Sequence, residues 1–269
     1  MSPLVKAGIM VIGGGEDKVQ DRKILKAFVE QSGGSSARIA IIPSASREPD
    51  IIGAIYQQIF TDLRASVVET LDIRERNSAI AAHGHIREFT GIFMTGGDQL
   101  RLCGLIGDTP LAITMRELAQ QGRVVLAGTS AGAAAMGHEM ISGGGSGEAP
   151  HREIVQMNIG LGILPEIIVD QHFHNRNRMA RLMTAIAAFP DKIGVGIDED
   201  TVAIFESDRT LRVMGRGTVT VIDPGEISYS NQAWVSGTTP LDLHNLRVHI
   251  LSEGSRYHLI KRIPISPMI

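Results

Sequence analysis

A serine flanked by glycines is the first part of this sequence that could do covalent chemistry. Ser130 lies in the pentapeptide Gly128–Gly132 (Gly-Thr-Ser-Ala-Gly), after the apolar run 124–127 and before the small-residue run 131–136. Such a strand–turn–helix pattern is typical of a nucleophile elbow, which exposes a serine hydroxyl at the edge of a sheet. The alternative is a buried strand followed by an ordinary glycine-rich turn. The flanking runs favour the elbow, so the pattern predicts Ser130 as an acyl-transfer nucleophile.

A serine nucleophile needs a base, and His172 is the strongest candidate among the nine histidines. It follows the apolar run Ile167–Val169. A parallel strand here would deliver it to the carboxyl edge of the sheet, where ligands of open α/β sheets bind. We expect His174 to lie in a solvated loop. The other histidines are expected to be structural or surface residues: His83, His85, His138, His151, His244, His249 and His258.

A third group must orient the base, and three consecutive carboxylates, Asp198–Asp200, follow the apolar strand Gly194–Ile197. Strand alternation places Glu199 on the opposite side from its two neighbours. The pattern does not tell which side faces His172, and an acidic turn without a catalytic role is the alternative. In chain order the candidates run serine, histidine, acid. This order differs from the serine, acid, histidine order of the α/β-hydrolases and argues against that fold family.

The developing oxyanion of acyl transfer needs backbone donors. The N–H of Ala131 begins the helix after Ser130, and a second N–H is expected from Gly96 or Gly97, which follow another strand. Glycines allow the backbone to approach a substrate closely, although they could equally form a tight turn alone. We assign Ala131 and Gly97 as the predicted oxyanion hole.

Three arginines close behind His172 suggest recognition of substrate carboxylates: Arg176, Arg178 and Arg181. At helical spacing only Arg178 and Arg181 share a face, and a solvated basic helix start is an equally good interpretation. Asp170, just before His172, could bind a cationic group of the substrate.

Composition and the remaining motifs exclude several other classes. A net charge of −3 gives no general attraction to nucleic acid or anionic membranes. The chain holds one cysteine, Cys103, and residues 1–12 lack the pattern of a signal peptide, so we expect a soluble protein of the reducing cytoplasm. Metal catalysis has little support because the sequence has no His-x-x-x-His pair on a helix and no cysteine set. His172 and His174 would share a face of an extended strand, but no third ligand is evident. The segment Gly13–Lys18 lacks the full phosphate-loop pattern and is expected to be a strand-ending turn.

Alternating apolar runs and helical patterns predict an α/β fold with a mostly parallel sheet flanked by helices. Strands are expected at 9–12, 38–42, 66–71, 91–94, 124–127 and 167–169, and helices at 21–31, 99–105, 110–121 and 177–189. A further helix is expected after Pro49, with Ile55, Ile59 and Leu63 on one apolar stripe. The glycine-rich segment Gly143–Gly147 is expected to be a mobile loop. After Gly194, short runs predict antiparallel strands that extend or cover the sheet. No linker separates the parts, so we expect one domain over residues 1–269.

Five motifs in order make the sequence closely resemble the cyanophycinases, serine peptidases related to α-aspartyl dipeptidase. They are Gly-Gly-Gly-Glu-Asp at 13–17, Thr-Gly-Gly-Asp-Gln at 95–99, Gly-Thr-Ser-Ala-Gly-Ala at 128–133, Asp-Gln-His-Phe at 170–173 with Arg-x-Arg-x-x-Arg at 176–181, and Gly-Ile-Asp-Glu-Asp-Thr at 196–201. The resemblance implies a fold like that of class I glutamine amidotransferases, with serine in place of their cysteine. It also implies a homodimer and no metal or organic cofactor.

Position by position, the resemblance implies Ser130 as nucleophile, His172 as base and Glu199 as triad acid. It also implies substrate-pocket roles, at Gln99, Asp170, Gln171, Arg176, Arg178 and Arg181. The implied substrate is cyanophycin, a poly-aspartate chain with arginine on each side-chain carboxylate, and the implied product is the β-Asp-Arg dipeptide. Asp98 beside Gln99 is similar to the polymer-degrading enzymes, whereas the dipeptidase relatives tend to carry asparagine there.

Three other functions compete with this hypothesis. The nearest is an α-aspartyl dipeptidase-like enzyme, but that relative uses an aspartate as its triad acid and is typically shorter. A different isoaspartyl peptide could be the substrate of the same chemistry. A non-catalytic binding protein is the third, and the complete serine, histidine and glutamate set counts against it.

Overall fold

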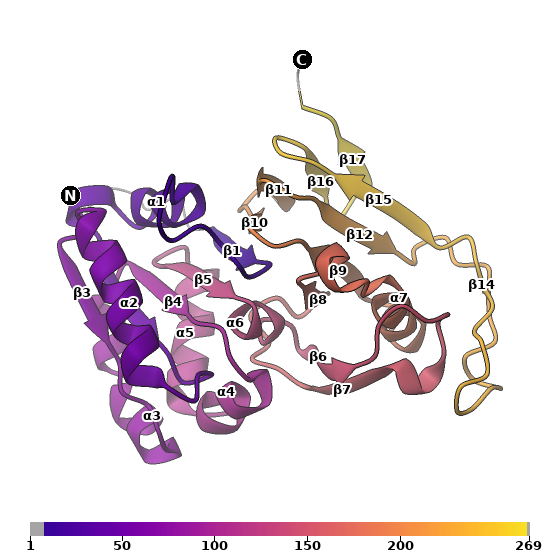
Figure 1. Cartoon of the computed structure of the whole chain (residues 1–269), viewed down its shortest axis with the longest axis horizontal. Coiled ribbons are helices and arrows are strands. Elements are labelled where there is room, and N and C mark those ends of the chain that lie inside the picture. Colours follow the sequence, from indigo (N-terminus) through magenta and orange to yellow (C-terminus); the bar gives the residue numbers. More distant parts are fainter. Residues whose placement is uncertain (1–7, 268–269) are drawn as a thin grey trace.

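The computed structural model describes residues 8–267. Residues 1–7, which belong to the segment considered above as a targeting signal, lie outside this range, as do residues 268–269. The amino-terminal half of the described chain lies on one side of the molecule and the last strands on the other (Figure 1). A large, mostly parallel sheet flanked by helices and a set of antiparallel carboxyl-terminal strands confirm the predicted fold class.

The main sheet has the strand order β17-β16-β11-β10-β1-β5-β4-β2-β3. Its parallel part comprises β1 (Ile9–Ile12), β5 (Val125–Thr129), β4 (Gly91–Met94), β2 (Arg38–Ile42) and β3 (Val67–Thr70). Its antiparallel part comprises β10 (Thr201–Phe205), β11 (Thr210–Gly215), β16 (Arg256–His258) and β17 (Ile263–Ile265). In the β1–β5 pair, Ile12 lies opposite Thr129. The residues after these two strands therefore meet at the same edge.

A second sheet, of order β15-β12-β9-β8, holds the strands that precede the predicted base and acid. They are β8 (Ile167–Gln171) and β9 (Ile193–Ile197), which run parallel, with β12 (Val219–Asp223) and β15 (Arg247–Leu251) antiparallel beside them. The strands after Gly194 were expected to extend or cover the sheet, but the separation of β8 and β9 from the main parallel sheet was not expected. The turn Asp198–Asp200 carries the chain from β9 across to β10 of the main sheet. Asp200 has a φ of 50° in this turn.

Helices cover both faces of the main sheet. They are α1 (Lys23–Gln31), α2 (Pro49–Asp62), α3 (Arg76–Ala82), α4 (Gln99–Ile106), α5 (Pro110–Gln120) and α6 (Ala131–Ala134). A further helix, α7 (Met179–Ala188), packs on the second sheet, and 3₁₀ turns lie at Gly34–Ser36, His85–Glu88, Arg152–Ile154 and His174–Arg176. Alternate strand residues explain the two faces: Ile39 and Ile41 of β2 pack in the cluster with α1 and α2, whereas Ala40 and Ile42 pack in the cluster with α4 and α5.

The buried face of α2 differs from the predicted stripe of Ile55, Ile59 and Leu63. Ile55 is 41% exposed, and the buried positions include Tyr56, Ile59 and Phe60. The aromatic rings decide the helix rotation because Tyr56 and Phe60 both pack against Phe93 of β4, at centroid distances of 4.7 and 5.2 Å.

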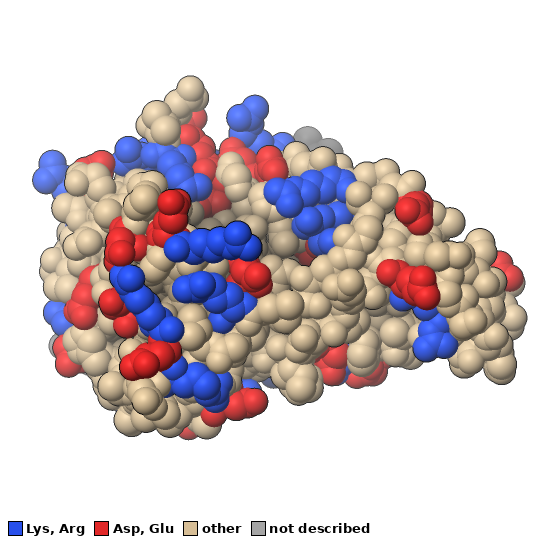
Figure 2. Space-filling view, turned by 60° about the horizontal axis from the view of Figure 1, so that its bottom comes forward, with Lys and Arg blue, Asp and Glu red and all other residues tan. Residues whose placement is uncertain are grey.

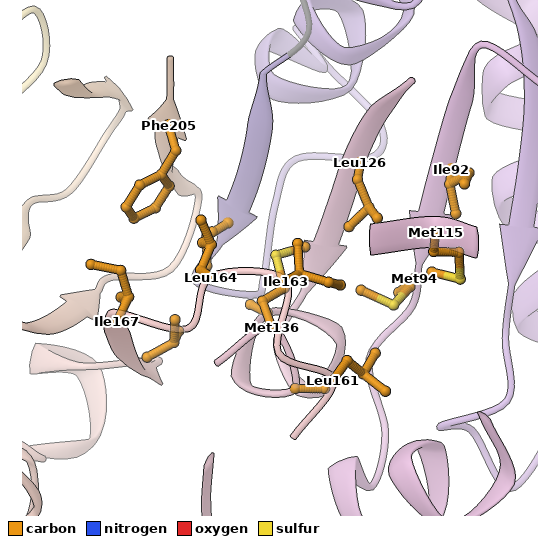
Figure 3. Close-up of a cluster of buried hydrophobic side chains, with 14 of the residues drawn as sticks. Ile92, Met94, Met115, Leu126, Met136, Leu161, Ile163, Leu164, Ile167 and Phe205 are labelled. Atoms are coloured by element: carbon orange, nitrogen blue, oxygen red, sulfur yellow. The ribbon is translucent and has the colours of Figure 1, made fainter. Parts of the chain in front are cut away.

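The segment after Ser130 sits on the main core. Figure 3 shows Met94 of β4, Leu126 of β5 and Met136 beyond α6 gathered with Leu161 and Ile163 of the connection to β8. All five side chains are at most 5% exposed. The helix that follows the candidate nucleophile is therefore held by dense apolar packing, which tolerates little displacement.

A hairpin replaces part of the predicted glycine-rich loop. β6 (Glu139–Gly144) pairs with β7 (Val155–Ile159), a strand that the sequence analysis missed, and its register shifts between Ile141 and Gly143. Gly143 and Gly144 therefore belong to a strand, and the exposed loop begins only after them. A short pair, β13 (Tyr229–Ser230) with β14 (Leu243–His244), lies further along the chain.

Charges of both signs are interspersed on the surface. On the face drawn in Figure 2, acidic and basic side chains alternate over the amino-terminal half, and the other half is mostly uncharged. This distribution agrees with the small net charge of −3. None of the helices within residues 8–267 is both long and apolar enough to cross a membrane.

Candidate active site

Ser130 occupies the junction between β5 and α6 with strained backbone angles, φ 52° and ψ −108°. Few non-glycine residues adopt this region, and such strain persists only where the surroundings impose it. A Cβ on Gly128 would lie 2.4 Å from the carbonyl oxygen of Gly132, and one on Gly132 would lie 2.5 Å from that of Met94. Glycine at both places therefore permits the close backbone approach that the pentapeptide predicted.

A chain of hydrogen bonds joins the three predicted catalytic side chains. Ser130 Oγ lies 3.0 Å from His172 Nε2, and His172 Nδ1 lies 2.6 Å from Glu199 Oε1. If Nδ1 donates to the carboxylate, Nε2 is the unprotonated nitrogen that faces the hydroxyl. Three segments that are far apart in sequence thus meet in the arrangement that an activated serine requires.

Burial is the main influence on the electrostatics of the base. It lowers the pKa of His172 below the ordinary value of 6.5, and the charges of Arg176 and Arg178 lower it further. The hydrogen bond to Glu199 acts in the opposite direction. The lowered pKa favours the neutral imidazole, which is the form that can accept the serine proton.

The glycine segment after β1 supports all three catalytic loops, a role that the sequence analysis missed. The carbonyl of Ile12 accepts from Ser130 N at 3.0 Å, that of Gly13 from His172 N at 2.8 Å, and that of Gly14 from Asp200 N at 2.9 Å. An ideal Cβ on Gly14 would lie 2.4 Å from Cε1 of His172. The segment treated above as a strand-ending turn is therefore the common backbone support of the site.

The two aspartates beside Glu199 face away from His172. Asp198 accepts hydrogen bonds from the backbone N–H groups of His174 and Thr218, both at 2.9 Å. Asp200 Oδ1 accepts from the backbone N–H of Asp17, also at 2.9 Å. As strand alternation predicted, Glu199 lies on the opposite side from Asp198 and Asp200, and the side of Glu199 is the one that faces His172.

Asp170 and Arg181, two predicted pocket residues, are paired with each other. Their side chains are 1% and 5% exposed, and Arg181 Nε donates to Asp170 Oδ2 at 2.6 Å while its Nη2 donates to Oδ1. A carboxylate and a guanidinium that saturate each other in the interior are not available to ligand groups. We therefore correct the expectation that Asp170 contacts a cationic substrate group: the pair forms a buried support beside Arg178.

Arg178 and Gln171 lie on this support with groups still free for a ligand. Arg178 Nη1 donates to the carbonyl of Gln171 at 2.6 Å and lies 3.6 Å from Asp170 Oδ1. Its side chain is 12% exposed, and burial lowers its pKa to about 10. Gln171 Oε1 is buried and has no hydrogen-bond partner within residues 8–267. The two side chains thus offer a positive donor and an unused acceptor.

The other predicted pocket residues are placed differently. Gln99 Nε2 donates to the carbonyls of Ile141 and Ser142 at 3.1 and 3.0 Å, which ties α4 to β6, and Arg176 is exposed. Asp98 accepts from the N–H groups of Leu100 and Arg101, so it is the N-cap of α4. This cap accounts for Asp98 without a role in ligand binding.

Backbone from two segments borders the serine. Ala131 N–H lies in the first turn of α6 and has no acceptor within the helix. Gly96 is adjacent to the nucleophile, since its ideal Cβ position is 3.9 Å from Ser130 Oγ. Gly97, the predicted second donor, follows directly. The region next to the serine hydroxyl is therefore formed by backbone from α6 and from the loop after β4.

A groove of about 1180 Å³ borders the far side of Glu199 rather than Ser130. Its lining includes Asp17, Asp21, Asn175 and Asp200. Asn175 Oδ1 accepts from the backbone N–H of Glu199 at 2.9 Å, a contact that no local pattern predicts. Glu199 therefore stands between the buried histidine and this solvent-filled groove, with its side chain 41% exposed.

The histidines outside the catalytic chain make local contacts. His174, expected in a solvated loop, is exposed, and its Nε2 lies 3.0 Å from Thr220 Oγ1. His85 and His151 pair with Glu69 and Glu148, at 2.9 and 3.0 Å. These contacts agree with the structural or surface roles predicted for such residues.

The sequence pattern of a known protein family covers the segment that carries this site. The pattern of peptidase family S51 matches residues 9–213, a segment that contains Ser130, His172 and Glu199. The chain belongs to peptidase family S51. It is therefore a peptidase, as the five motifs predicted.

Named relatives of this S51 chain cover almost its whole length. The cyanophycinase of Trichormus variabilis is 55% identical over 259 residues, which is 96% of this chain and 87% of that protein. The cyanophycinase of Geminocystis herdmanii is 51% identical over 271 residues, with 100% of both chains covered. The cyanophycinase of Thermosynechococcus vestitus is 54% identical over 256 residues, 94% of this chain and 80% of that protein. The resemblance read from the motifs is thus confirmed.

Solved structures support the fold. A peptidase from an acI-B1 Actinobacterium matches with a TM-score of 0.67 at 19% identity, covering 94% of this chain and 96% of that one. A putative peptidase E from Listeria monocytogenes matches with a TM-score of 0.53 at 15% identity, covering 78% and 99%. At these identities the similarity concerns the fold alone.

Proposed function

We propose that this S51 peptidase hydrolyses cyanophycin to β-Asp-Arg dipeptides through an acyl-enzyme on Ser130. The hydrogen-bonded chain from Ser130 through His172 to Glu199 is the observation that carries the proposal. The cyanophycinase relatives, at 51–55% identity, supply the substrate class. The polypeptide acts as one domain, because Ser130 follows a strand of the main sheet whereas His172 and Glu199 follow strands of the second sheet.

The mechanism follows from the positions of the three side chains. His172 Nε2 takes the proton of Ser130 Oγ as this oxygen attacks the backbone carbonyl of an aspartyl residue. Ala131 and Gly97 N–H groups stabilise the oxyanion. The imidazolium, stabilised by Glu199, then gives its proton to the leaving amine as the C–N bond breaks. Water, deprotonated by His172, attacks the acyl-serine ester and releases the product and the free hydroxyl.

The side chains around His172 suit a substrate with carboxylate and N–H groups. Arg178 and Arg176 bring two positive charges, while the one carboxylate beneath, Asp170, is already paired with Arg181. The surplus of positive charge favours a substrate carboxylate. Gln171 Oε1, buried and unpartnered within the described residues, favours a substrate N–H donor at the same place. Cyanophycin, with backbone amides, guanidinium groups and a terminal carboxylate, carries both kinds of group.

The assembly and compartment belong to the same proposal. We expect a homodimer, as the resemblance implies, and exposed apolar residues on neighbouring carboxyl-terminal segments, Ile260 at 70% and Ile263 at 46%, offer surface for an interface. Light scattering on the purified protein measures the mass of the assembly. We expect a cytoplasmic location, because a chain with a single cysteine cannot form an internal disulfide.

The substrate is tested by incubating the purified protein separately with insoluble cyanophycin, with α-aspartyl dipeptides and with other isoaspartyl peptides, followed by mass spectrometry of the soluble products. Release of β-Asp-Arg from the polymer supports the proposal. Cleavage of the α-aspartyl dipeptides alone would support the dipeptidase-like alternative. Cleavage of other isoaspartyl peptides but not of cyanophycin would keep the chemistry and change the substrate. No cleavage of any of them would favour a binding protein.

Gly14→Ala is expected to lower kcat by about 10²-fold, because displacement of a catalytic group by about 1 Å has this effect. The added Cβ would lie 2.4 Å from Cε1 and 2.5 Å from Nε2 of His172, so the ring must move away from Ser130. Gly34→Ala is the matched control, since Gly34 also has a positive φ of 59° but an added Cβ there meets nothing within 4 Å. Equal rates for Gly14→Ala and Gly34→Ala would contradict the supporting role of the segment.

The pH dependence follows from the lowered pKa of His172. The base accepts a proton only when neutral, so activity is lost as pH falls through its pKa in the folded enzyme. Because burial and two arginines hold that pKa below 6.5, the acid limb of kcat/KM is expected to have its midpoint below pH 6.5. Arg176→Gln should move the midpoint upward, since it removes one positive charge. A wild-type midpoint above 6.5 would disagree with the buried, arginine-flanked base.

A further inference from the structure

A buried carboxylate that the proposed mechanism does not use lies directly behind the nucleophile. The side chain of Glu16 is 1% exposed. Its Oε2 accepts from Thr129 Oγ1 at 2.6 Å, and its Oε1 accepts from the hydroxyl of Tyr56 and lies 3.0 Å from Lys18 Nζ. Burial of a carboxylate is unfavourable unless such partners compensate it. Both oxygens are in fact engaged.

Two of the partners, Thr129 and Tyr56, come from other parts of the fold that must stay in register around the site. Thr129 is the last residue of β5 and immediately precedes Ser130. Tyr56 lies in α2 and packs against Phe93 of β4. Glu16 itself follows the segment Ile12–Gly14, whose three carbonyls hold the backbones of the serine, histidine and acid loops.

We propose that Glu16 is a positioning residue for the reaction: its carboxylate fixes the support segment Ile12–Gly14 against Thr129, and thereby holds Ser130 and His172 at reacting distance. This inference rests on the proposed function of Ser130. The strained backbone angles of Ser130 persist only where the surroundings impose them. The hydrogen bond from Thr129 Oγ1 to Glu16 holds the residue immediately before Ser130. At the other end of the support segment, Gly14 lies against the His172 ring, so a shift of this segment would move the ring.

A carboxylate suits this place better than an amide. Hydroxyl and ammonium donors converge on both oxygens, and an ionised carboxylate accepts on both, whereas glutamine presents two N–H donors in place of one oxygen. Hydrogen bonds to a charged acceptor are also stronger than those to a neutral one. Lys18 balances the charge from the solvent side, where its side chain is 34% exposed and its Nζ lies 5.4 Å from the Tyr56 ring centroid.

The test compares Glu16→Gln with Glu30→Gln, an exposed glutamate of α1, in the full chain. Two quantities are measured below the melting temperature of every variant: kcat and KM for cyanophycin oligomers, and the rate of Ser130 inactivation by a small fluorophosphonate. Glu16→Gln is expected to lower both kcat and the inactivation rate by about 10- to 100-fold, with KM little changed. Glu30→Gln is expected to match the wild type.

A second pair keeps the test decisive if Glu16→Gln fails to fold. Thr129→Val removes the hydroxyl that donates to Glu16, and Thr129→Ser keeps it. The valine variant should lose inactivation rate in the same way, and the serine variant should retain most of it. A lower melting temperature with unchanged kcat and inactivation rate, in Glu16→Gln or in Thr129→Val, would overturn the positioning role. Failure of the wild type to react at Ser130 would instead refute the proposed function.

Discussion

Hydrolysis of cyanophycin by Ser130→Ala is expected to fall by about 10⁶-fold, the loss typical when the nucleophile of a serine triad is removed. The substitution deletes the only atom positioned to attack, Oγ, which lies 3.0 Å from the base. It removes no atom from the apolar core beneath α6, and alanine adopts the same strained backbone as readily as serine. The melting temperature should therefore change little, which a thermal scan of both proteins measures.

Ser146→Ala is the control for this variant, since Ser146 lies exposed in the loop after β6. It should keep the wild-type rate of β-Asp-Arg release. A Ser130→Ala protein that is folded and releases dipeptide at the rate of the Ser146→Ala control would refute the covalent mechanism. The peptidase would then have to use a nucleophile elsewhere in the chain.

Glu199→Gln is expected to lower kcat by about 10⁴-fold, as the corresponding acid-to-amide change does in other serine triads. Glu199 Oε1 accepts from His172 Nδ1 at 2.6 Å and so fixes the tautomer with an unprotonated Nε2. A glutamine can turn its amide N–H toward Nδ1, which favours the tautomer that cannot accept the serine proton. It also lacks the negative charge that stabilises the imidazolium during catalysis.

Asp200→Asn is the matched comparison for the acid. Asp200 holds a backbone N–H through Oδ1, and asparagine retains that acceptor, so its rate should stay near that of the wild type. Steady-state kinetics of the two variants and of Asp198→Asn decide the assignment. Normal kcat in Glu199→Gln together with a large loss in Asp198→Asn or Asp200→Asn would transfer the orienting role to one of those aspartates.

The sequence was most informative where a local pattern determines a local structure. The apolar runs at 9–12, 38–42 and 91–94 coincide with β1, β2 and β4. The glycines of Gly128–Gly132 indicated a tight turn, which the structure contains with Ser130 at a φ of 52°. The residues that follow parallel strands were expected to meet at the carboxyl edge, and Ser130, His172 and Glu199 do lie together.

Features that depend on packing between distant segments were not predictable. Three glycines after a strand have the same local pattern whether they face solvent or, as Gly14 does, the ring of a histidine 158 residues further along the chain. Asp170 and Arg181 were both expected to face a substrate, because sequence identifies them only as polar. Their ion pair depends on how α7 packs back on β8.

The division into two sheets was missed for a related reason. Short strands that end in turns look alike in sequence whether they extend one sheet or begin another. The turn Asp198–Asp200 determines which sheet the next strand joins. Its hydrogen-bond partners Thr218 and Asp17 are distant in the sequence, so no local pattern shows these contacts. The same turn places Glu199 toward His172, so the topology and the candidate site are determined together.

The most direct test of the account is to treat the protein with a fluorophosphonate and to map the adduct by mass spectrometry while following β-Asp-Arg release from cyanophycin. The account predicts one covalent adduct, on the peptide that contains Ser130, and loss of dipeptide release in proportion to the labelled fraction. An adduct on another residue, or undiminished release from fully labelled protein, would contradict the assignment of Ser130 as the nucleophile.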